Sequence, residues 1–218
     1  LSPLLWASVA TGKRPDKHGI LTDRVLNHET GAVEPVSARH LTATPVWRIL
    51  QANGLRTHVV NWPATHPAPS SDHGGVVVTD RFWSELREPG KTWPLTAGSV
   101  VPGRLADALA DFRIHPAEIR AADLLPFVPR LREFAGQQDG RLSALAVILA
   151  ETASVHAAAT WLLEHEPWDL AAIHYPGLER LGAGFARYLP PVPKGHDPDD
   201  RLADVLTAGY RFHDQMLG

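Results

Sequence analysis

Hydrophobic and polar positions alternate along this chain in two periods, one typical of helices and one typical of strands. Apolar residues at helical spacing, bounded by capping or breaking residues, predict helices over residues 2–10, 46–52, 141–165 and 201–217. Short runs of apolar and β-branched residues predict strands over residues 56–61, 75–79 and 168–175. A short helix that leads directly into a strand is the unit of a parallel sheet. We therefore expect an α/β fold with a doubly wound, mostly parallel sheet and helices on both faces.

The stretch 84–140 lacks such regular patterns. Prolines and glycines divide it into short segments, of which Arg104–Phe112 and Ala117–Leu125 have the composition of short helices. We expect a helical insertion or cap over the sheet, whose side chains would influence substrate choice. Residues 21–43 are polar with turn signals and predict a surface excursion, and the Pro/Gly/Ser-rich residues 62–75 predict a loop.

The first predicted helix carries a candidate nucleophile. Ser2 followed by Pro3 is a strong signal for a helix start, Gly12 ends the helix, and residues 14–16 predict a turn. A hydroxyl at a helix N-terminus lies where backbone dipoles and free N–H groups favour negative charge. Ser2 is therefore well placed to become an alkoxide or to hold a phosphate. The same pattern is also typical of a serine that only caps a helix.

The composition limits the class of protein and its partners. The chain has 218 residues, 44% of them hydrophobic and 21% charged, which is enough for one α/β domain with a sizeable core. Its formal net charge of −3 provides no basic surface for a nucleic acid duplex. Because the chain has no cysteine, disulfides and thiolate zinc sites are excluded.

No stretch of the sequence predicts a membrane span. The longest apolar run, residues 142–150, is interrupted by Ser143 and is far shorter than the roughly 20 residues that a spanning helix needs. The chain begins with Leu1 and lacks a charged-then-apolar leader, and this absence favours a cytoplasmic location.

The opening residues resemble a known nucleophile segment. They read Ser2-Pro-Leu-Leu-Trp-Ala-Ser-Val-Ala-Thr-Gly12, followed by Lys13-Arg-Pro-Asp-Lys-His-Gly-Ile20. This segment is similar to the alkaline phosphatase superfamily, and more narrowly to its type I phosphodiesterase/nucleotide pyrophosphatase branch. That family has a Thr or Ser ten residues before the Gly of a Thr-Gly pair, then a Pro and a His-Gly. The resemblance places Ser2 at the nucleophile position.

A second segment, Asn61–Ala68 together with Val77–Phe82, resembles the family's sequence between two sheet strands. In that case Asp80 closes a strand at the edge of the active face, although a strand-ending carboxylate is more often a turn or helix cap. The string from Ser71 to Gly74 copies the Asp-His-Gly string with which the superfamily binds metal. Here the string precedes a strand and lies in a loop, which holds ligands poorly, so we expect no metal site there.

A third segment, Tyr175–Pro191, resembles the family's zinc-binding pattern of a strand, an Asp, three residues and a His. Glu179 occupies the Asp position and Ala183 the His position. Glu is still an oxygen ligand, whereas Ala cannot bind a metal. His174 and His196 have the wrong offset to replace the missing His. We expect His174 in the core or at its rim, and His196 in a polar turn.

The resemblance implies an alkaline phosphatase-like fold, with residues 1–218 as the central part of one domain. It implies a hydrolase of small phosphorylated substrates such as nucleotides or phosphodiesters, acting through a phospho-enzyme intermediate. Ser2 would be the nucleophile and bridge a metal, and Glu179 would be a metal ligand. Two divalent ions, zinc in the family's pattern, would take most of their ligands from outside this chain. The alternative is a non-catalytic relative that binds a ligand or partner, which the residues at 179 and 183 favour.

Overall fold

The computed structural model describes residues 2–69, 74–84, 86–191 and 199–218, and these residues form two compact units. The first unit comprises the described residues of Leu1–Arg87, Lys91–Phe112 and Ala157–His174. The second comprises those of Glu88–Gly90, Arg113–His156 and Tyr175–Gly218. The helical insertion at 84–140 within one larger domain stays a prediction.

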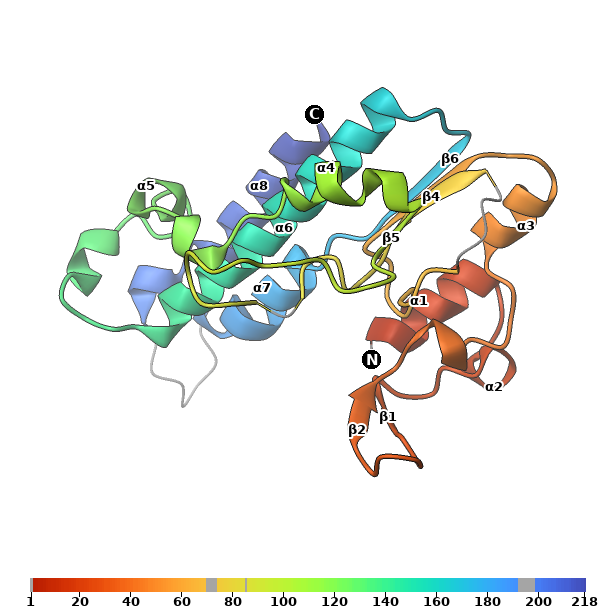
Figure 1. The fold of residues 1–218 in the computed structure, drawn as a ribbon. Helices are drawn as coiled ribbons and strands as arrows, with labels where there is room; N and C mark the ends of the chain where they lie inside the picture. The colour runs from red at the N-terminus through yellow and green to blue at the C-terminus, as the bar shows by residue number, and fades with distance from the viewer. Residues whose placement is uncertain (1, 70–73, 85, 192–198) are drawn as a thin grey trace. The chain divides into compact units, whose positions relative to one another are not determined.

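The first unit is built on a four-stranded sheet whose order is β5-β4-β3-β6 (Figure 1). Three strands run parallel, with Val59 opposite both Val77 and Ala172: β3 (Thr57–Val60), β4 (Gly75–Val78) and β6 (Leu170–Ile173). The edge strand β5 (Val100–Val101) is antiparallel to β4. The three predicted strands are confirmed, and the unit is a mixed α/β structure with a mostly parallel sheet. Its doubly wound arrangement stays a prediction.

The helices of the first unit begin and end close to the predicted residues. α1 (Ser2–Thr11) ends where Gly12 adopts a φ of 63°, and α3 (Val46–Ala52) has the predicted bounds. The turn predicted at residues 14–16 is wrong, because Pro15 starts a helix and its fixed φ suits the first helical position. The remaining elements are α2 (Pro15–His18), the antiparallel pair β1 (Arg24–Leu26) and β2 (Val33–Pro35), the 3-10 helices η1 (Ala38–His40) and η2 (Gly103–Leu105), and α4 (Ala106–Ala110).

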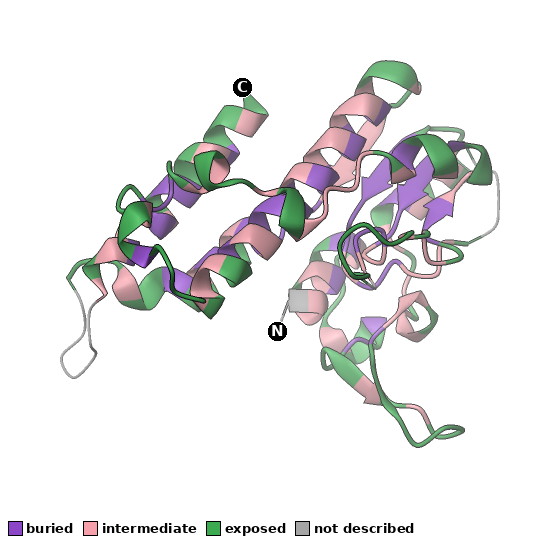
Figure 2. Ribbon diagram, turned by 60° about the vertical axis from the view of Figure 1, so that its left-hand side comes forward, coloured by how far each residue is buried: buried purple, intermediate pink, exposed green. Residues whose placement is uncertain are grey.

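Side chains on one face of the sheet pack against α1 and α3. Val59 of β3 and Val77 of β4 form a buried cluster with Ala10, Trp47 and Trp62. Figure 2, which colours buried residues purple, shows that the strands of this sheet are largely buried. All four residues of β3 are buried, as expected for a central strand of a parallel sheet. Full burial of one large apolar side chain contributes about 1.5–3 kcal/mol, so this cluster fixes both helices on the sheet.

The segment that follows α1 is attached to it by His18. The His18 side chain is fully buried, and its Nδ1 atom accepts the Ile20 N–H at 3.1 Å. The proton therefore lies on Nε2, which donates to Ser8 Oγ at 2.9 Å, and Ser8 Oγ donates to the Leu4 carbonyl oxygen at 3.1 Å. This chain of hydrogen bonds joins α2 to the first turns of α1.

We expect Gly19→Ala to destabilise the protein more than Gly12→Ala. Both glycines have positive φ, 85° and 63°, but only at Gly19 would a Cβ meet the chain, 2.6 Å from the His40 carbonyl oxygen. For a residue other than glycine, the left-handed conformation alone costs of order 1–3 kcal/mol of stability. At position 19 the clash adds to this cost, and we expect the total loss of stability to exceed about 3 kcal/mol. Urea unfolding followed by circular dichroism measures both losses. Equal losses of stability in the two variants would contradict the predicted clash between a side chain at position 19 and the His40 carbonyl oxygen.

The second unit is helical in its described residues. Its core contains Phe127, Leu145, Leu181 and Val205. The predicted long helix is confirmed as α6 (Gly140–His165), whose last residues belong to the first unit. The other helices are α5 (Ala121–Leu124), α7 (Gly177–Phe185) and α8 (Val205–Leu217), and the 3-10 helices are η3 (Pro116–Glu118), η4 (Leu131–Phe134), η5 (Ala186–Tyr188) and η6 (Asp200–Leu202).

The helices predicted from residues 104, 117 and 201 are each broken in the structure. A 3-10 turn precedes a shorter α-helix in all three cases: η2 precedes α4, η3 precedes α5, and η6 precedes α8. Short 3-10 turns are frequent at helix starts, and apolar spacing does not distinguish them from an α-helical turn.

The amphipathic pattern of residues 201–217 predicts that the Arg, Asp and His side chains of this helix lie on a solvated face. Arg211 and Asp214 are exposed as predicted, but the prediction for His213 is wrong, since only 6% of this residue is exposed. Its Nδ1–H donates to the Gly209 carbonyl oxygen at 2.8 Å, and its ring lies edge-on to that of Tyr175, with centroids 6.2 Å apart. His213 is therefore a core residue of the second unit.

α6 is long and apolar enough, by length and composition alone, to cross a membrane. Core helices of globular proteins pass the same test, and 56% of its most apolar stretch is buried inside this protein. The helix also carries Glu151, whose side chain is paired inside the second unit. These features are those of a core helix, and no membrane span is shown.

Glu151 is the buried acid of α6. Only 7% of the residue is exposed, and its Oε2 atom accepts a hydrogen bond from the Arg180 guanidinium of α7. Burial raises the pKa of Glu151, and attraction to Arg180 opposes the rise without cancelling it. The ion pair therefore joins α6 to α7 at the cost of removing a carboxylate from water.

We expect the stability difference between the wild type and Glu151→Gln to change with pH. A group whose pKa is raised on folding stabilises the folded state at low pH, and this contribution is lost as pH rises from about 4.5 through the raised value. Wild-type stability relative to the variant should therefore fall with rising pH, as measured by urea unfolding across that range. Glu164→Gln, which alters an exposed carboxyl of the same helix, is the matched control. A rising difference, or an equal slope in the control, would contradict this reasoning.

Candidate functional site

The N-terminal end of α1 lies at the carboxyl ends of the parallel strands. Ala10 packs with Val59 over the sheet face, whereas Trp6, one turn nearer the helix start, contacts residues that follow the strands. The Trp6 ring lies 5.1 Å from the ring of Trp62 and 4.8 Å from that of His174, between centroids. A helix running from Ala10 back through Trp6 brings its first turn, which begins at Ser2, to this edge of the sheet. Ligands of open α/β sheets bind at the same edge.

Polar groups join the ends of β3 and β6 at this edge. Asn61 directly follows β3, adopts a φ of 54°, and donates from Nδ2 to the His174 carbonyl oxygen at 3.2 Å. His174 donates its backbone N–H to the Val60 carbonyl oxygen at 2.9 Å. His174 is 6% exposed and packs on Trp6, which confirms the prediction of a core or rim residue. No local sequence pattern marks Asn61, although a non-glycine residue at positive φ beside a strand end often marks a functional site.

Asp80 organises the loop that follows β3. One carboxylate oxygen accepts the Ala64 N–H at 2.9 Å and the other accepts the His66 N–H at 3.0 Å. Burial raises the pKa of Asp80, and the two backbone hydrogen bonds oppose this rise. Asp80 is thus the loop cap that the sequence allows, located where β4 ends.

Ser8 and His18 lie at hydrogen-bond distance but cannot work as a nucleophile and its base. A serine is activated when the imidazole nitrogen facing it is free to accept a proton. Here Nδ1 accepts the Ile20 N–H, so Nε2, the nitrogen facing Ser8, already carries the proton. This pair therefore has a structural role, which leaves Ser2 as the candidate in this segment.

Glu179 and Ala183 lie on α7, in the second unit. Four residues separate them, so they share one face of the helix, and both are exposed. The residues that follow β6 therefore form a helix from Gly177 onward. The prediction that Ser2 and Glu179 both bind metal is not tested by this placement and stays a prediction.

The residues present do not form a complete metal site. Across residues 2–69, 74–84, 86–191 and 199–218, no group of three or more His, Cys, Asp or Glu side chains could hold an ion. Ala183 offers no ligand beside Glu179, and a protein zinc site normally needs about three. The Asp-His-Gly string at 71–74 and His196 lie outside the described residues, apart from Gly74.

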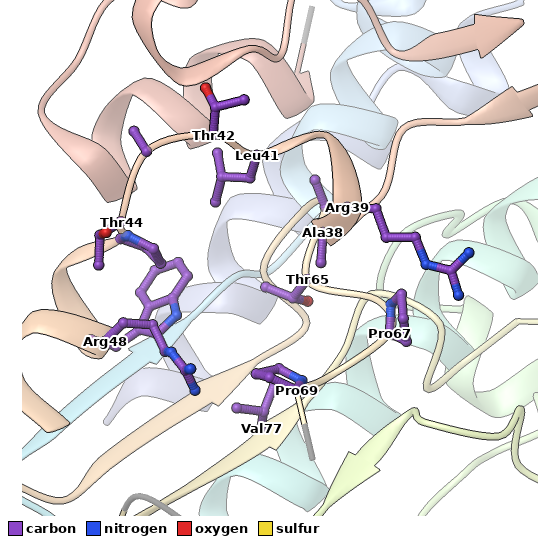
Figure 3. Close-up of a pocket in the computed structure, with 14 residues that line it drawn as sticks. Ala38, Arg39, Leu41, Thr42, Thr44, Arg48, Thr65, Pro67, Pro69 and Val77 are labelled. Atoms are coloured by element: carbon purple, nitrogen blue, oxygen red, sulfur yellow. The ribbon is translucent and has the colours of Figure 1, made fainter. Parts of the chain in front are cut away.

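A pocket of about 500 Å³ opens in the first unit, between residues 38–48 and the loop after β3 (Figure 3). Its walls are mostly apolar, and they include Trp47 and Val77 of the buried cluster. Arg39 and Arg48 are the charged residues of its lining. The residues of this segment have no catalytic spacing, so their sequence does not predict a pocket.

Together, the fold and this edge define an α/β protein in which a serine-bearing helix begins where a parallel sheet presents its ligand-binding side. Over residues 1–218, the whole chain matches the family described as Type I phosphodiesterase / nucleotide pyrophosphatase, and the chain belongs to that family. The predicted resemblance is thereby confirmed. No curated protein and no solved structure matches the chain.

We expect Asp80→Asn to destabilise the first unit by about 1–3 kcal/mol. An amide has only one acceptor oxygen, so either the Ala64 or the His66 N–H would lose its partner and face an NH₂ group. Denaturant unfolding measures the loss. Asp107→Asn, at an exposed carboxyl of α4, is the control and should change stability by less than about 0.5 kcal/mol. Equal effects would show that the Asp80 hydrogen bonds contribute nothing specific.

Proposed function

We propose that this protein is a metal-dependent phosphoester hydrolase that uses Ser2 as its nucleophile. Its family is one of phosphoester hydrolases of the phosphodiesterase and nucleotide pyrophosphatase type, so small phosphoesters are the expected substrates. The observation that carries the proposal is the location of the first turn of α1 at the carboxyl edge of the sheet. Ser2 begins that turn.

The helix start favours the charges that phosphoryl transfer produces. The first N–H groups of a helix have no partner within it, and the helix dipole places partial positive charge there. An anionic phosphoester would be attracted to this end, and a serine alkoxide would be stabilised by the same groups. Trp6 and Trp62 hold this end of α1 against the sheet, so the serine backbone would be positioned before a substrate arrives.

The proposed reaction has two displacements. In the first, the Ser2 oxygen forms a bond to phosphorus, the ester P–O bond breaks, and the leaving alkoxide takes up a proton. In the second, a water oxygen attacks the phosphoserine, the bond between the Ser2 oxygen and phosphorus breaks, and the serine regains its proton. A diester would thus yield an alcohol and a monoester.

We include metal dependence in this proposal because the family to which the chain belongs is typically metal-dependent. A metal ion would supply a lower pKa for the serine hydroxyl and charge neutralisation at phosphorus. Of the residues at family ligand positions, Ser2 and Glu179 are the candidates that this chain offers. Because Ala183 cannot bind a metal, these residues alone do not complete a metal site.

A second candidate function is supported by α7. Its exposed face carries Glu179 and, four residues on, Ala183, where the family's pattern has an Asp and a His. A relative that has lost a metal ligand can retain the fold and bind a phosphorylated ligand or a partner without turning it over.

We expect Ser2→Ala to lower the hydrolysis of bis(4-nitrophenyl) phosphate by about 10³-fold or more, because the nucleophile is removed. Zinc content and turnover should be measured together on the same protein. Ser143→Ala, at an exposed serine of α6, is the control and should retain full activity. Unchanged turnover in Ser2→Ala would reject Ser2 as nucleophile. A wild type without stoichiometric metal or turnover, in which Ala183→His creates both, would favour the binding function.

A further inference from the structure

We propose that the pocket between residues 38–48 and 64–69 of the first unit binds a small organic anion with a flat apolar body, such as an aryl carboxylate or an aryl phosphate. The pocket encloses about 500 Å³, within the roughly 300–1,000 Å³ typical of ligand sites. The inference rests on the lining and charge of this pocket, and it holds whether or not Ser2 is a nucleophile.

The lining suits an apolar body. Leu41, Pro45, Trp47, Pro67 and Val77 contribute apolar surface from three separate segments of the chain (Figure 3). Trp47 is 6% exposed, and its ring contacts that of Trp62 at 5.5 Å between centroids, so the indole is held in place. A fixed aromatic wall favours a flat ligand because stacking adds to the burial of apolar area.

The charge of the lining suits an anion. Arg39 and Arg48 extend on opposite sides of the pocket in Figure 3, and among the described residues that line it there is no Asp or Glu. Arg39 is exposed and forms no ion pair within the described part of the chain. Asp80 accepts a hydrogen bond from the hydroxyl of Thr65, a lining residue, and directs both carboxylate oxygens to backbone N–H groups. The exposed Arg39 guanidinium therefore adds positive charge to the described lining, and a guanidinium matches a carboxylate or phosphate head group.

The walls are held together without a ligand. Ala38 donates its backbone N–H to the His66 carbonyl oxygen at 2.8 Å, which joins η1 to the loop after β3. Ala68 in the same loop donates to the Gly98 carbonyl oxygen at 3.0 Å, and Asp80 holds the N–H groups of Ala64 and His66. A preformed pocket loses little conformational freedom on binding, so even a small ligand can bind measurably.

The test is calorimetric titration of the full chain with three probes of one size: benzoate, phenylphosphonate and neutral benzyl alcohol. The phosphonate is used because no P–O ester bond in it can be hydrolysed. We expect an anion to bind about fivefold more tightly than the alcohol, and Arg39→Gln to remove that advantage. Arg14→Gln, at an exposed arginine of the same unit outside the pocket, should leave it unchanged.

A second variant tests the location. Ala43→Phe fills the pocket from a half-buried loop position and should abolish binding of every probe, while circular dichroism verifies its fold. Tighter binding of benzoate or of phenylphosphonate identifies the head group as carboxylate or phosphate. The proposal is overturned if no probe binds at millimolar concentration, if the alcohol binds as tightly as the anions, if Arg39→Gln and Arg14→Gln weaken binding equally, or if Ala43→Phe binds normally.

Discussion

The packing of Trp6 on the carboxyl edge of the sheet determines where the chemistry of this protein can lie. Its ring contacts Trp62 after β3 and His174 after β6, and its backbone carbonyl accepts the Trp62 indole N–H at 3.2 Å. α1 is apolar on all sides and has almost no amphipathic character of its own, so its direction depends on such specific contacts. With them, the helix start faces the side of the sheet where α/β proteins bind ligands.

The residues that carry the family resemblance also have structural roles, which explains their spacing. His18 is buried and joins α2 to Ser8 on α1, and Gly19 passes so close to the His40 carbonyl oxygen that no side chain fits. The distance along the chain from Ser2 to this His-Gly pair is therefore fixed by a helix, a tight connection and a buried imidazole. A motif of this kind identifies a fold more directly than a reaction.

The sequence predicted those elements whose limits are set locally. α3 lies between Pro45 and Asn53, and β3, β4 and α6 are long enough, or apolar enough, to give a clear period. β5 has two residues and α2 has four, too few for any period, and both exist because neighbouring segments pair with or cap them. For the site, the sequence allowed the capping role of Asp80, whereas the roles of Ser2 and Glu179 stay predictions. The contacts of Asn61 and the pocket at 38–48 depend on residues brought together by folding, and local patterns carry no such information.

The start of α1 and the exposed face of α7 differ in how much of a functional site this chain provides at each. At the helix start, the backbone itself supplies the favourable field, and Ser2 needs only to occupy the first turn. On α7, the backbone supplies only the spacing: residues four apart share a face, but a metal needs side-chain ligands at both positions, and Ala183 has none. A single carboxylate on an exposed helix face binds a divalent ion weakly because water competes for the ion and no second ligand offsets its dehydration. Under the proposed function, phosphoester chemistry would therefore require other ligands to complete an ion's coordination beside Ser2, whereas attraction of a phosphate would require only the helix start.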